Sequence, residues 1–314
     1  MPALSRRGLL LLPLASVLRA RSDAEWILRL GGRIERDASG EIIAIHLANS
    51  WINDTEMLEL PGFENLQRLD LSHTRISDEG LLRLRPAKNI RELELFYAEQ
   101  ITDLGMNAIK GWHNLKRLNV RGTRIADETL AIVGDLRQLE WLDIANTSVT
   151  DNGLESLAAL TSLKHLGMGR SRVSDAAAGV IRVLSTLESI DLGGPRGTAR
   201  NQRNRGIGPL SPSLVSALSE LKELRVILFG HSEVDAEALR KLADLPRVEK
   251  LGLEGCQAVD DTALEALAAW KRLQFLDIQE TKVTEKGIDK FRSLRPNVKV
   301  LAGPFAAASG QNAR

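Results

Sequence analysis

One sequence pattern recurs along most of the chain and constrains its fold more than any other feature. Residues 65–87 read NLQRLDLSHTRISDEGLLRLRPA, in which apolar residues hold fixed offsets. The pattern begins at nine positions that lie 24 or 25 residues apart, except for one interval of 37: Glu64, Lys88, His113, Arg137, Thr161, Ser185, Lys222, Pro246 and Lys271. A fixed period of this length indicates a solenoid of stacked units.

Within one unit the apolar spacing changes from that of a strand to that of a helix. In residues 139–160, Leu142 and Ile144 alternate with polar residues, which predicts a short strand. Leu154, Leu157 and Leu160 then follow at helical spacing. Each unit therefore predicts a strand, a turn and a helix, and consecutive strands must run parallel.

The repeated segment L-x-x-L-x-L followed by I-S/T-D-x-G-L resembles leucine-rich-repeat proteins. Its closest likeness is to ribonuclease-inhibitor-like repeats, in the short cysteine-containing subclass of F-box proteins and many secreted bacterial proteins. Two 25-residue units, with LFYAEQITD and LEGCQAVDD, carry the extra turn residue common in that subclass. No F-box helices precede the repeats. The resemblance implies an α/β, right-handed horseshoe, with a parallel sheet on the concave face and helices on the convex face. It also implies a binding role and supplies no catalytic motif.

The start of each expected helix carries the same two residue types. Nine of ten units place a residue able to cap a helix after the inward Ile or Val, and Ala126 is the exception. An acidic residue usually follows, which suits the positive end of a helix dipole. We therefore interpret the repeated aspartates as caps and not as catalytic groups.

The chain ends differ from the repeats. Residues 1–20 have the layout of an export signal, with Arg6 and Arg7 before a short apolar run and features of a twin-arginine signal. That run is too short to span a bilayer, so we expect no integral membrane protein. We predict export to the periplasm or the extracellular space. The alternative is an N-terminal helix of a cytoplasmic protein.

The remaining residues divide into three parts, and the second of them contains an inserted loop. Residues 21–63 predict an N-terminal cap, with a hairpin turning at 38–40, and a first incomplete repeat. Residues 64–301 predict about nine repeats, 193–209 an inserted basic loop, and 302–314 a disordered tail.

The strand residues between the leucines should face the concave side in two columns, the first running from Ala44 to Phe275. Aromatic, histidine and arginine residues gather there in the first five repeats, and this composition is typical of interface hot spots. The expected partner-binding residues are Arg68, His73, Phe96, Tyr97, Arg117, Arg121, Trp141, His165 and Arg170. The alternative is cross-strand packing that only stiffens the sheet.

A second candidate site is the inserted segment GGPRGTARNQRNRGIGP. Its arginines suit an anionic ligand such as a carboxylate, a phosphate or a sulfated glycan: Arg196, Arg200, Arg203 and Arg205. The alternative is a surface loop without a ligand.

Several chemistries lack support in the sequence. The five histidines are scattered, so zinc spacing is absent, and a single cysteine, Cys256, at an inward position allows no disulfide framework. No nucleophile motif or phosphate loop occurs, and the formal charge of +1 does not favour nucleic acid. We expect a monomeric, non-enzymatic protein without cofactor or metal that binds a protein or peptide. The alternatives are carbohydrate binding, with Trp141, Tyr97 and Phe96 stacking on sugars, and a cytosolic adaptor or host-interaction scaffold.

Overall fold

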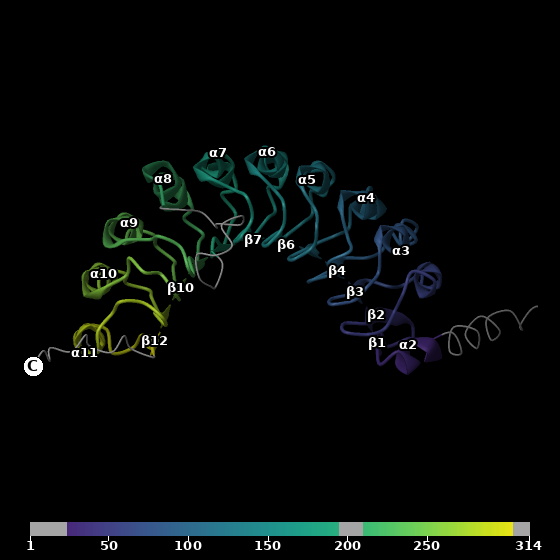
Figure 1. Cartoon of the computed structure of the whole chain (residues 1–314), viewed down its shortest axis with the longest axis horizontal. Helices are drawn as coiled ribbons and strands as arrows, with labels where there is room; N and C mark the ends of the chain where they lie inside the picture. The colour runs from purple at the N-terminus through teal and green to yellow at the C-terminus, as the bar shows by residue number, and fades with distance from the viewer. Residues whose placement is uncertain (1–23, 195–209, 304–314) are drawn as a thin grey trace, which may run out of the picture.

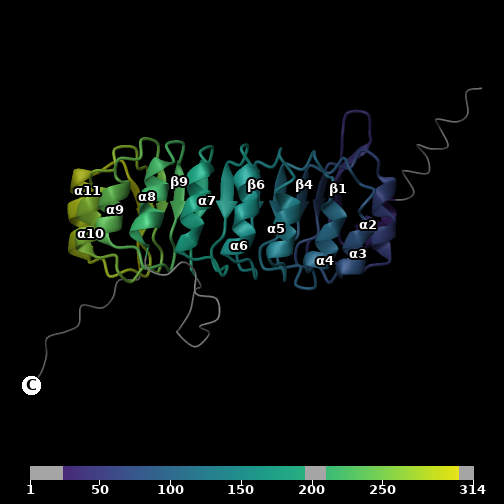
Figure 2. The same ribbon diagram turned by 90° about the horizontal axis from the view of Figure 1, so that it is seen from above.

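The computed structural model describes residues 24–194 and 210–303 and shows a single curved body (Figure 1). Strands line the inner side of the arc, and helices line the outer side. Seen from above, the helices lie side by side along the body (Figure 2). Units that follow each other in sequence are therefore neighbours in space, as the fixed period predicted.

Twelve short strands form one open sheet in sequence order. The β1–β2 pair is antiparallel, and every later neighbour is parallel. The strands are β1 (Arg33–Arg36), β2 (Ile42–His46), β3 (Arg68–Asp70), β4 (Glu92–Glu94), β5 (Arg117–Asn119), β6 (Trp141–Asp143), β7 (His165–Gly167), β8 (Ser189–Asp191), β9 (Val226–Leu228), β10 (Lys250–Gly252), β11 (Phe275–Asp277) and β12 (Lys299–Leu301).

The outer layer consists of short helices. The α-helices are α2 (Glu25–Arg29), α3 (Asp78–Leu82), α4 (Asp103–Met106), α5 (Asp127–Val133), α6 (Asp151–Leu154), α7 (Ala178–Val183), α8 (Pro212–Glu220), α9 (Ala236–Leu242), α10 (Asp261–Leu267) and α11 (Glu285–Leu294). The 3-10 turns are η1 (Glu56–Leu58), η2 (Leu60–Gly62), η3 (Asn107–Ile109), η4 (Glu155–Ala159) and η5 (Asp175–Ala177).

The core runs between the two layers as continuous columns of apolar side chains. The middle residue of each repeat strand, such as Leu69 or Leu142, is almost fully buried. Trp112 and Trp270 replace leucines in the helix-end column and are buried as well. Cys256 occupies an inward turn position where its sulfur lies 3.4 Å from the carbonyl oxygen of Phe229. Burial raises the pKa of this thiol, so it fills space and is not a thiolate.

Most helix caps follow the sequence pattern, but the hydroxyl of Thr150 forms no cap bond and donates to Asp127. The hydroxyl of Ser77 accepts a hydrogen bond from the amide of Glu79, and the carboxylate of Asp260 accepts two amide bonds. The aspartates after the caps have a role beyond capping, because most of them also bond the cap residue of the next repeat. Their carboxylates accept from the backbone amide and from the hydroxyl of that residue in five pairs: Asp54–Ser77, Asp78–Thr102, Asp127–Thr150, Asp151–Ser174 and Asp261–Thr284.

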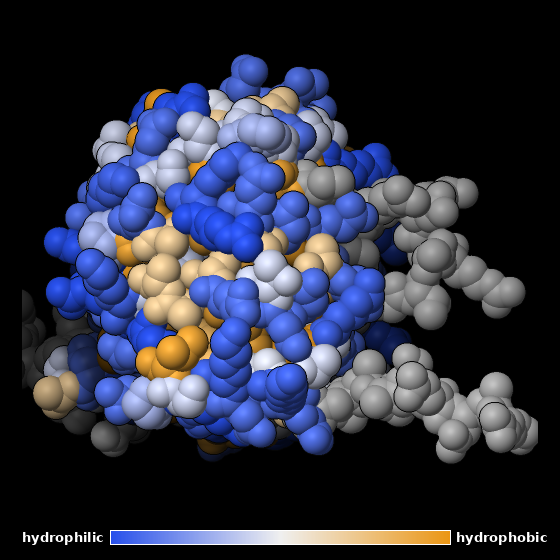
Figure 3. Space-filling view, turned by 90° about the vertical axis from the view of Figure 1, so that its left-hand side faces the viewer, coloured by the Kyte–Doolittle hydropathy of each residue, from blue (hydrophilic) through white to orange (hydrophobic). Residues whose placement is uncertain are grey.

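The ends of the solenoid carry the elements expected there. At the N-terminal end, α2 and the β1–β2 hairpin precede the first parallel strand, and the hairpin turns at Gly40 with φ +88°. At the C-terminal end, β12 is the last strand. Apolar groups gather in the middle of that end within a ring of polar groups (Figure 3). No helix among the described residues is long and apolar enough to cross a membrane. Outside the described residues lie the predicted export signal (1–20), the first three residues of the predicted cap (21–23) and most of the predicted tail (304–314).

Candidate functional site on the concave sheet

The parallel register brings the outer residues of the strands into two columns, as the repeat spacing predicted. The first column contains Ala44, Arg68, Glu92, Arg117, Trp141, His165, Ser189, Val226, Lys250 and Phe275. The second contains His46, Asp70, Glu94, Asn119, Asp143, Gly167, Asp191, Leu228, Gly252 and Asp277. Side chains in one column are neighbours even where they are 24 residues apart in sequence.

Three planar side chains of the first column form one stack across β5, β6 and β7. The guanidinium carbon of Arg117 lies 3.4 Å from the ring centroid of Trp141. The His165 ring lies parallel to the same indole, with 4.6 Å between centroids and 6° between planes. Because β6 lies between β5 and β7, the two partners approach opposite faces of Trp141. The indole therefore presents only its edge to a ligand.

The environment of His165 keeps its imidazole neutral. Burial, together with the nearby charges of Arg117 and Arg121, lowers the pKa of His165 to about 4. At neutral pH this histidine offers an uncharged stacking surface and a hydrogen-bonding ring.

Arg121 lies beside the stack and is held by two acidic residues of the second column. Its Nη1 atom lies 3.2 Å from Asp143 and 3.4 Å from Asp191. Burial raises the pKa of Asp143, and the charge of Arg121 opposes that effect. The side chain of Asp143 is only 8% exposed, so its ionised form depends on Arg121. Arg121 is thus part of a buried charge network.

An aromatic cluster lies where the chain leaves β3 and β4. His73 and Tyr97 stack at 5.6 Å and 9°, and Phe96 meets both rings edge-on at 5.0 and 4.7 Å. His73 and Tyr97 have positive φ angles of 55° and 54°, which turn these side chains along the edge of the sheet. The Tyr97 ring also lies over Gly122, where a Cβ would stand 2.8 Å from the ring. His73 and Gly122 therefore occupy the space beside the Tyr97 ring.

Arg68 is engaged with the N-terminal hairpin. It forms an ion pair with Glu35, and Glu35 also lies 2.9 Å from His46. This arrangement explains one wrong expectation. Ala44 was predicted to face outward, yet it is fully buried. It pairs with Glu35 on one side and Arg68 on the other, and the ion pair between those longer side chains spans its methyl group.

Arg170 borders a separate hollow of about 330 Å³ farther along the concave side. Its Nε atom donates to the carbonyl oxygen of Gly194 at 3.2 Å. Glycines 193, 194, 230 and 252 contribute to the hollow and leave the backbone accessible between Arg121 and Lys250. Lys250 lies 5.1 Å from the ring centroid of Phe275, which also borders this hollow. Arg170 thus makes no contact with the Trp141 stack, but Arg121, which lies beside that stack, borders the same hollow.

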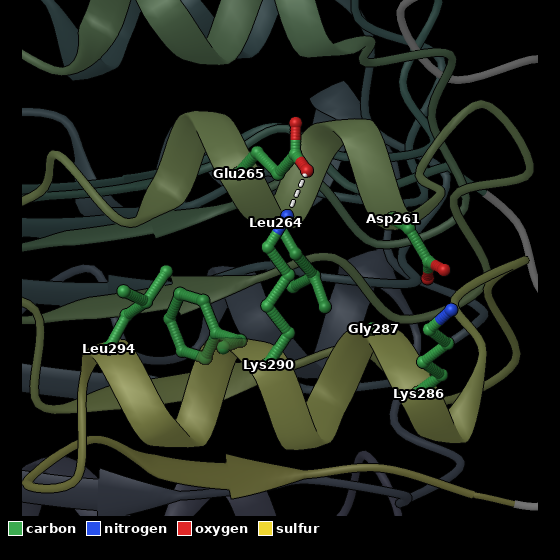
Figure 4. A pocket seen from close by; sticks show the side chains of 8 residues that line it. Asp261, Leu264, Glu265, Lys286, Gly287, Lys290 and Leu294 are labelled. Atoms are coloured by element: carbon green, nitrogen blue, oxygen red, sulfur yellow. Dashed lines mark hydrogen bonds and ion pairs between the residues drawn. The ribbon is translucent and has the colours of Figure 1, made fainter.

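The four loop arginines, Arg196, Arg200, Arg203 and Arg205, lie outside the described residues. Trp51, which is 77% exposed beside Arg75, was not among the predicted site residues, because it lies at a turn position outside the two strand columns. A groove between α10 and α11 on the convex side contains the 2.6 Å ion pair of Lys290 with Glu265 (Figure 4). Within the described ranges, no three histidine, cysteine, aspartate or glutamate residues are placed to hold a metal ion.

Comparison with known proteins addresses the fold. A family model described as "Leucine Rich repeat" matches residues 64–84. An internalin from Listeria monocytogenes is similar over 91% of this chain and 88% of its own, with 16% identity and a TM-score of 0.50. The Arabidopsis receptor kinase HAESA ectodomain, solved with a peptide hormone, is similar over 86% of this chain at 17% identity and a TM-score of 0.57.

These likenesses and the sheet topology decide the architecture. The chain folds as a leucine-rich-repeat solenoid. The solenoid spans 46% of the HAESA ectodomain, about half its length. No curated protein matches the sequence significantly. At these identities the solved structures establish the fold and leave the ligand to be argued from the residues of this solenoid.

Proposed function

We propose that this solenoid is a non-enzymatic recognition module that binds a protein or peptide on its concave face. The observation that carries the proposal is the presence of two aromatic groups on the concave side, the Arg117–Trp141–His165 stack and the cluster of His73, Phe96 and Tyr97. The stack is preorganised, so binding would cost little side-chain entropy there. Aromatic and arginine side chains dominate binding energy at protein interfaces. The HAESA ectodomain, which shares the fold, was solved with a peptide ligand.

The occupied ring faces favour this proposal over carbohydrate binding. A sugar ring stacks on a free aromatic face, but Arg117 and His165 cover the faces of Trp141. His73 and Gly122 similarly flank Tyr97. What these rings expose is their edges, which suit contacts with protein side chains.

A cross-linking pull-down from envelope extract would test the proposal. A double variant, Phe96→Ala with Trp141→Ala, alters the concave surface. A matched control, Leu104→Ala with Val183→Ala, removes apolar groups that are 68% and 53% exposed on the convex side. We expect a partner that the parent and the control capture and that the concave variant loses. Capture by all three proteins, each shown to be folded by circular dichroism, would contradict the proposal.

Finer assignments belong to the same proposal. We propose the ribonuclease-inhibitor-like, cysteine-containing subclass, because two units carry its extra turn residue. Export through the signal at 1–20, a monomeric state, the division at residues 63 and 301 and an anion site on the 193–209 loop are proposed on sequence alone. Sequencing the N-terminus of the purified protein would test the first of these, because an uncleaved Met1 would support the cytoplasmic alternative.

A further inference from the structure

The two long edges of the sheet differ in how their charges are paired. On the edge before the strands, Lys116 and Lys164 both pair with Glu140, at 3.0 and 2.7 Å. Arg225 continues this ladder by pairing with Glu249 at 2.9 Å. Charges on that edge therefore neutralise one another between repeats.

The opposite edge, which follows the strands, carries exposed arginines at one turn position of alternate repeats. These are Arg75, Arg124 and Arg172, which follow β3, β5 and β7, and we call them the arginine edge. Among the described residues, none of the three makes an ion pair or a side-chain hydrogen bond with a partner. Arg75 instead lies with its guanidinium carbon 5.6 Å from the ring centroid of Trp51.

Backbone hydrogen bonds hold two of these arginines in register with the preceding repeat. The amide of Arg124 donates to the carbonyl of Ile101 at 2.8 Å, and the amide of Arg172 donates to Val149 at 2.9 Å. Neighbouring strands lie about 4.8 Å apart, so arginines on alternate repeats lie roughly 10 Å apart. Three residues of an extended chain rise about 9–10 Å. The arginine spacing therefore matches every third residue of an extended chain.

We propose that the arginine edge binds an extended acidic segment of a protein partner, with a carboxylate at every third residue. Charge complementarity selects this ligand, because the three cations lack counter-charges among the described residues. With a carboxylate at every third residue, an extended segment of about seven residues is long enough to contact all three arginines. The only acid at this turn in the intervening repeats is Glu99, and a ligand of that spacing places no carboxylate opposite it.

A hollow of about 390 Å³ at the start of the arginine edge supplies an anchor for one end of the segment. It is lined by Trp51, Ile52, Asn49, His73 and Arg75, among others. Trp51 has the largest exposed fraction of the large apolar side chains described. We expect an apolar ligand residue to contact this indole just before the first carboxylate. The inference adds a second surface to the proposed function and does not depend on the Trp141 stack.

Fluorescence anisotropy with the full chain and two labelled nine-residue peptides would test the inference. One peptide begins with leucine and carries glutamate at every third position, and the other has the same composition with adjacent glutamates. Reversing the arginine edge with Arg75→Glu, Arg124→Glu and Arg172→Glu should weaken binding of the spaced peptide about 30-fold or more. The matched control Arg83→Glu, Arg240→Glu and Arg292→Glu makes the same charge change on the convex helices. It should alter the affinity by less than about threefold.

The remaining outcomes separate this inference from the concave-face proposal. The parent should prefer the spaced peptide over the adjacent one about tenfold, and Trp141→Ala should retain that binding. Equal binding of both peptides, or tighter binding of a heparin hexasaccharide, would overturn the inference. A loss of binding in the Trp141→Ala variant alone would also overturn the inference. That result would still be consistent with the proposed binding on the concave face.

Discussion

The carboxylate of Asp54 occupies the space that a Cβ on Gly80 would need. The same relationship holds between Asp78 and Gly105, and between Asp261 and Gly287. In each pair the aspartate bonds the helix cap of the next repeat, and the glycine lies three residues after that cap. The recurrence of D-x-G in the repeat is therefore explained by packing, because the aspartate of one unit lies against the glycine of the next unit.

Gly80→Ala should lower the free energy of unfolding by about 1–3 kcal/mol, because the new methyl group must displace the Asp54 carboxylate. Gly179→Ala is the matched control, since nothing lies within 4 Å of its Cβ position in α7. That control should raise stability by up to about 1 kcal/mol. Urea unfolding of both variants measures the difference, and equal effects would contradict the steric explanation.

In the repeat that contains Ala126, the aspartate of the preceding unit bonds different groups. Ala126 has no hydroxyl, and the Asp103 carboxylate instead accepts from Ala126 and Thr129 amides and the Thr129 hydroxyl. Thr129→Val keeps the shape but removes a buried donor, so it should cost about 1–2 kcal/mol of unfolding free energy. Adding Ala126→Ser to that variant should restore part of the loss. No rescue in urea unfolding would mean that the two hydroxyl positions are not equivalent.

The sequence predicted the architecture well because the repeat fixes which residue of each unit enters the core. The caps, the two concave columns and the buried positions of Trp112 and Cys256 follow from that spacing alone. Side-chain partners between repeats did not follow, because they depend on rotamers. The spacing places Arg117 and His165 on either side of Trp141, but nothing in the sequence indicates that they stack on its indole or that Glu35 reaches over Ala44. Trp51 was missed because it precedes the inward Ile52 at a turn position, outside the two columns from which the site was predicted.

Arg121 and Arg117 both contact acids on the concave face, but their removal should have different effects on stability. Arg121→Ala leaves the nearly buried carboxylate of Asp143 without its main counter-charge, which should cost about 3 kcal/mol. Arg117 is 36% exposed in its pair with Glu94, so Arg117→Ala should cost less than about 1 kcal/mol. Chemical unfolding of both variants is the measurement. A loss below about 1 kcal/mol for Arg121→Ala would show that Asp143 does not depend on Arg121, and Arg121 would then be usable as a binding probe.

Protonation of His165 should destabilise the fold in mildly acidic solution. Its pKa is about 4 in the folded protein and about 6.5 in an unfolded chain, so the unfolded state binds the proton more readily. The stabilisation is complete above about pH 6.5 and is lost as the pH falls toward 4, by roughly 2–3 kcal/mol. His165→Phe keeps a ring against Trp141 but cannot be protonated, so it should flatten the pH dependence over this range. The control His113→Phe changes an exposed histidine and should leave the dependence as in the parent. Urea unfolding between pH 4 and 7 compares the three proteins. A parallel decline in all three would assign the acid sensitivity to groups other than His165.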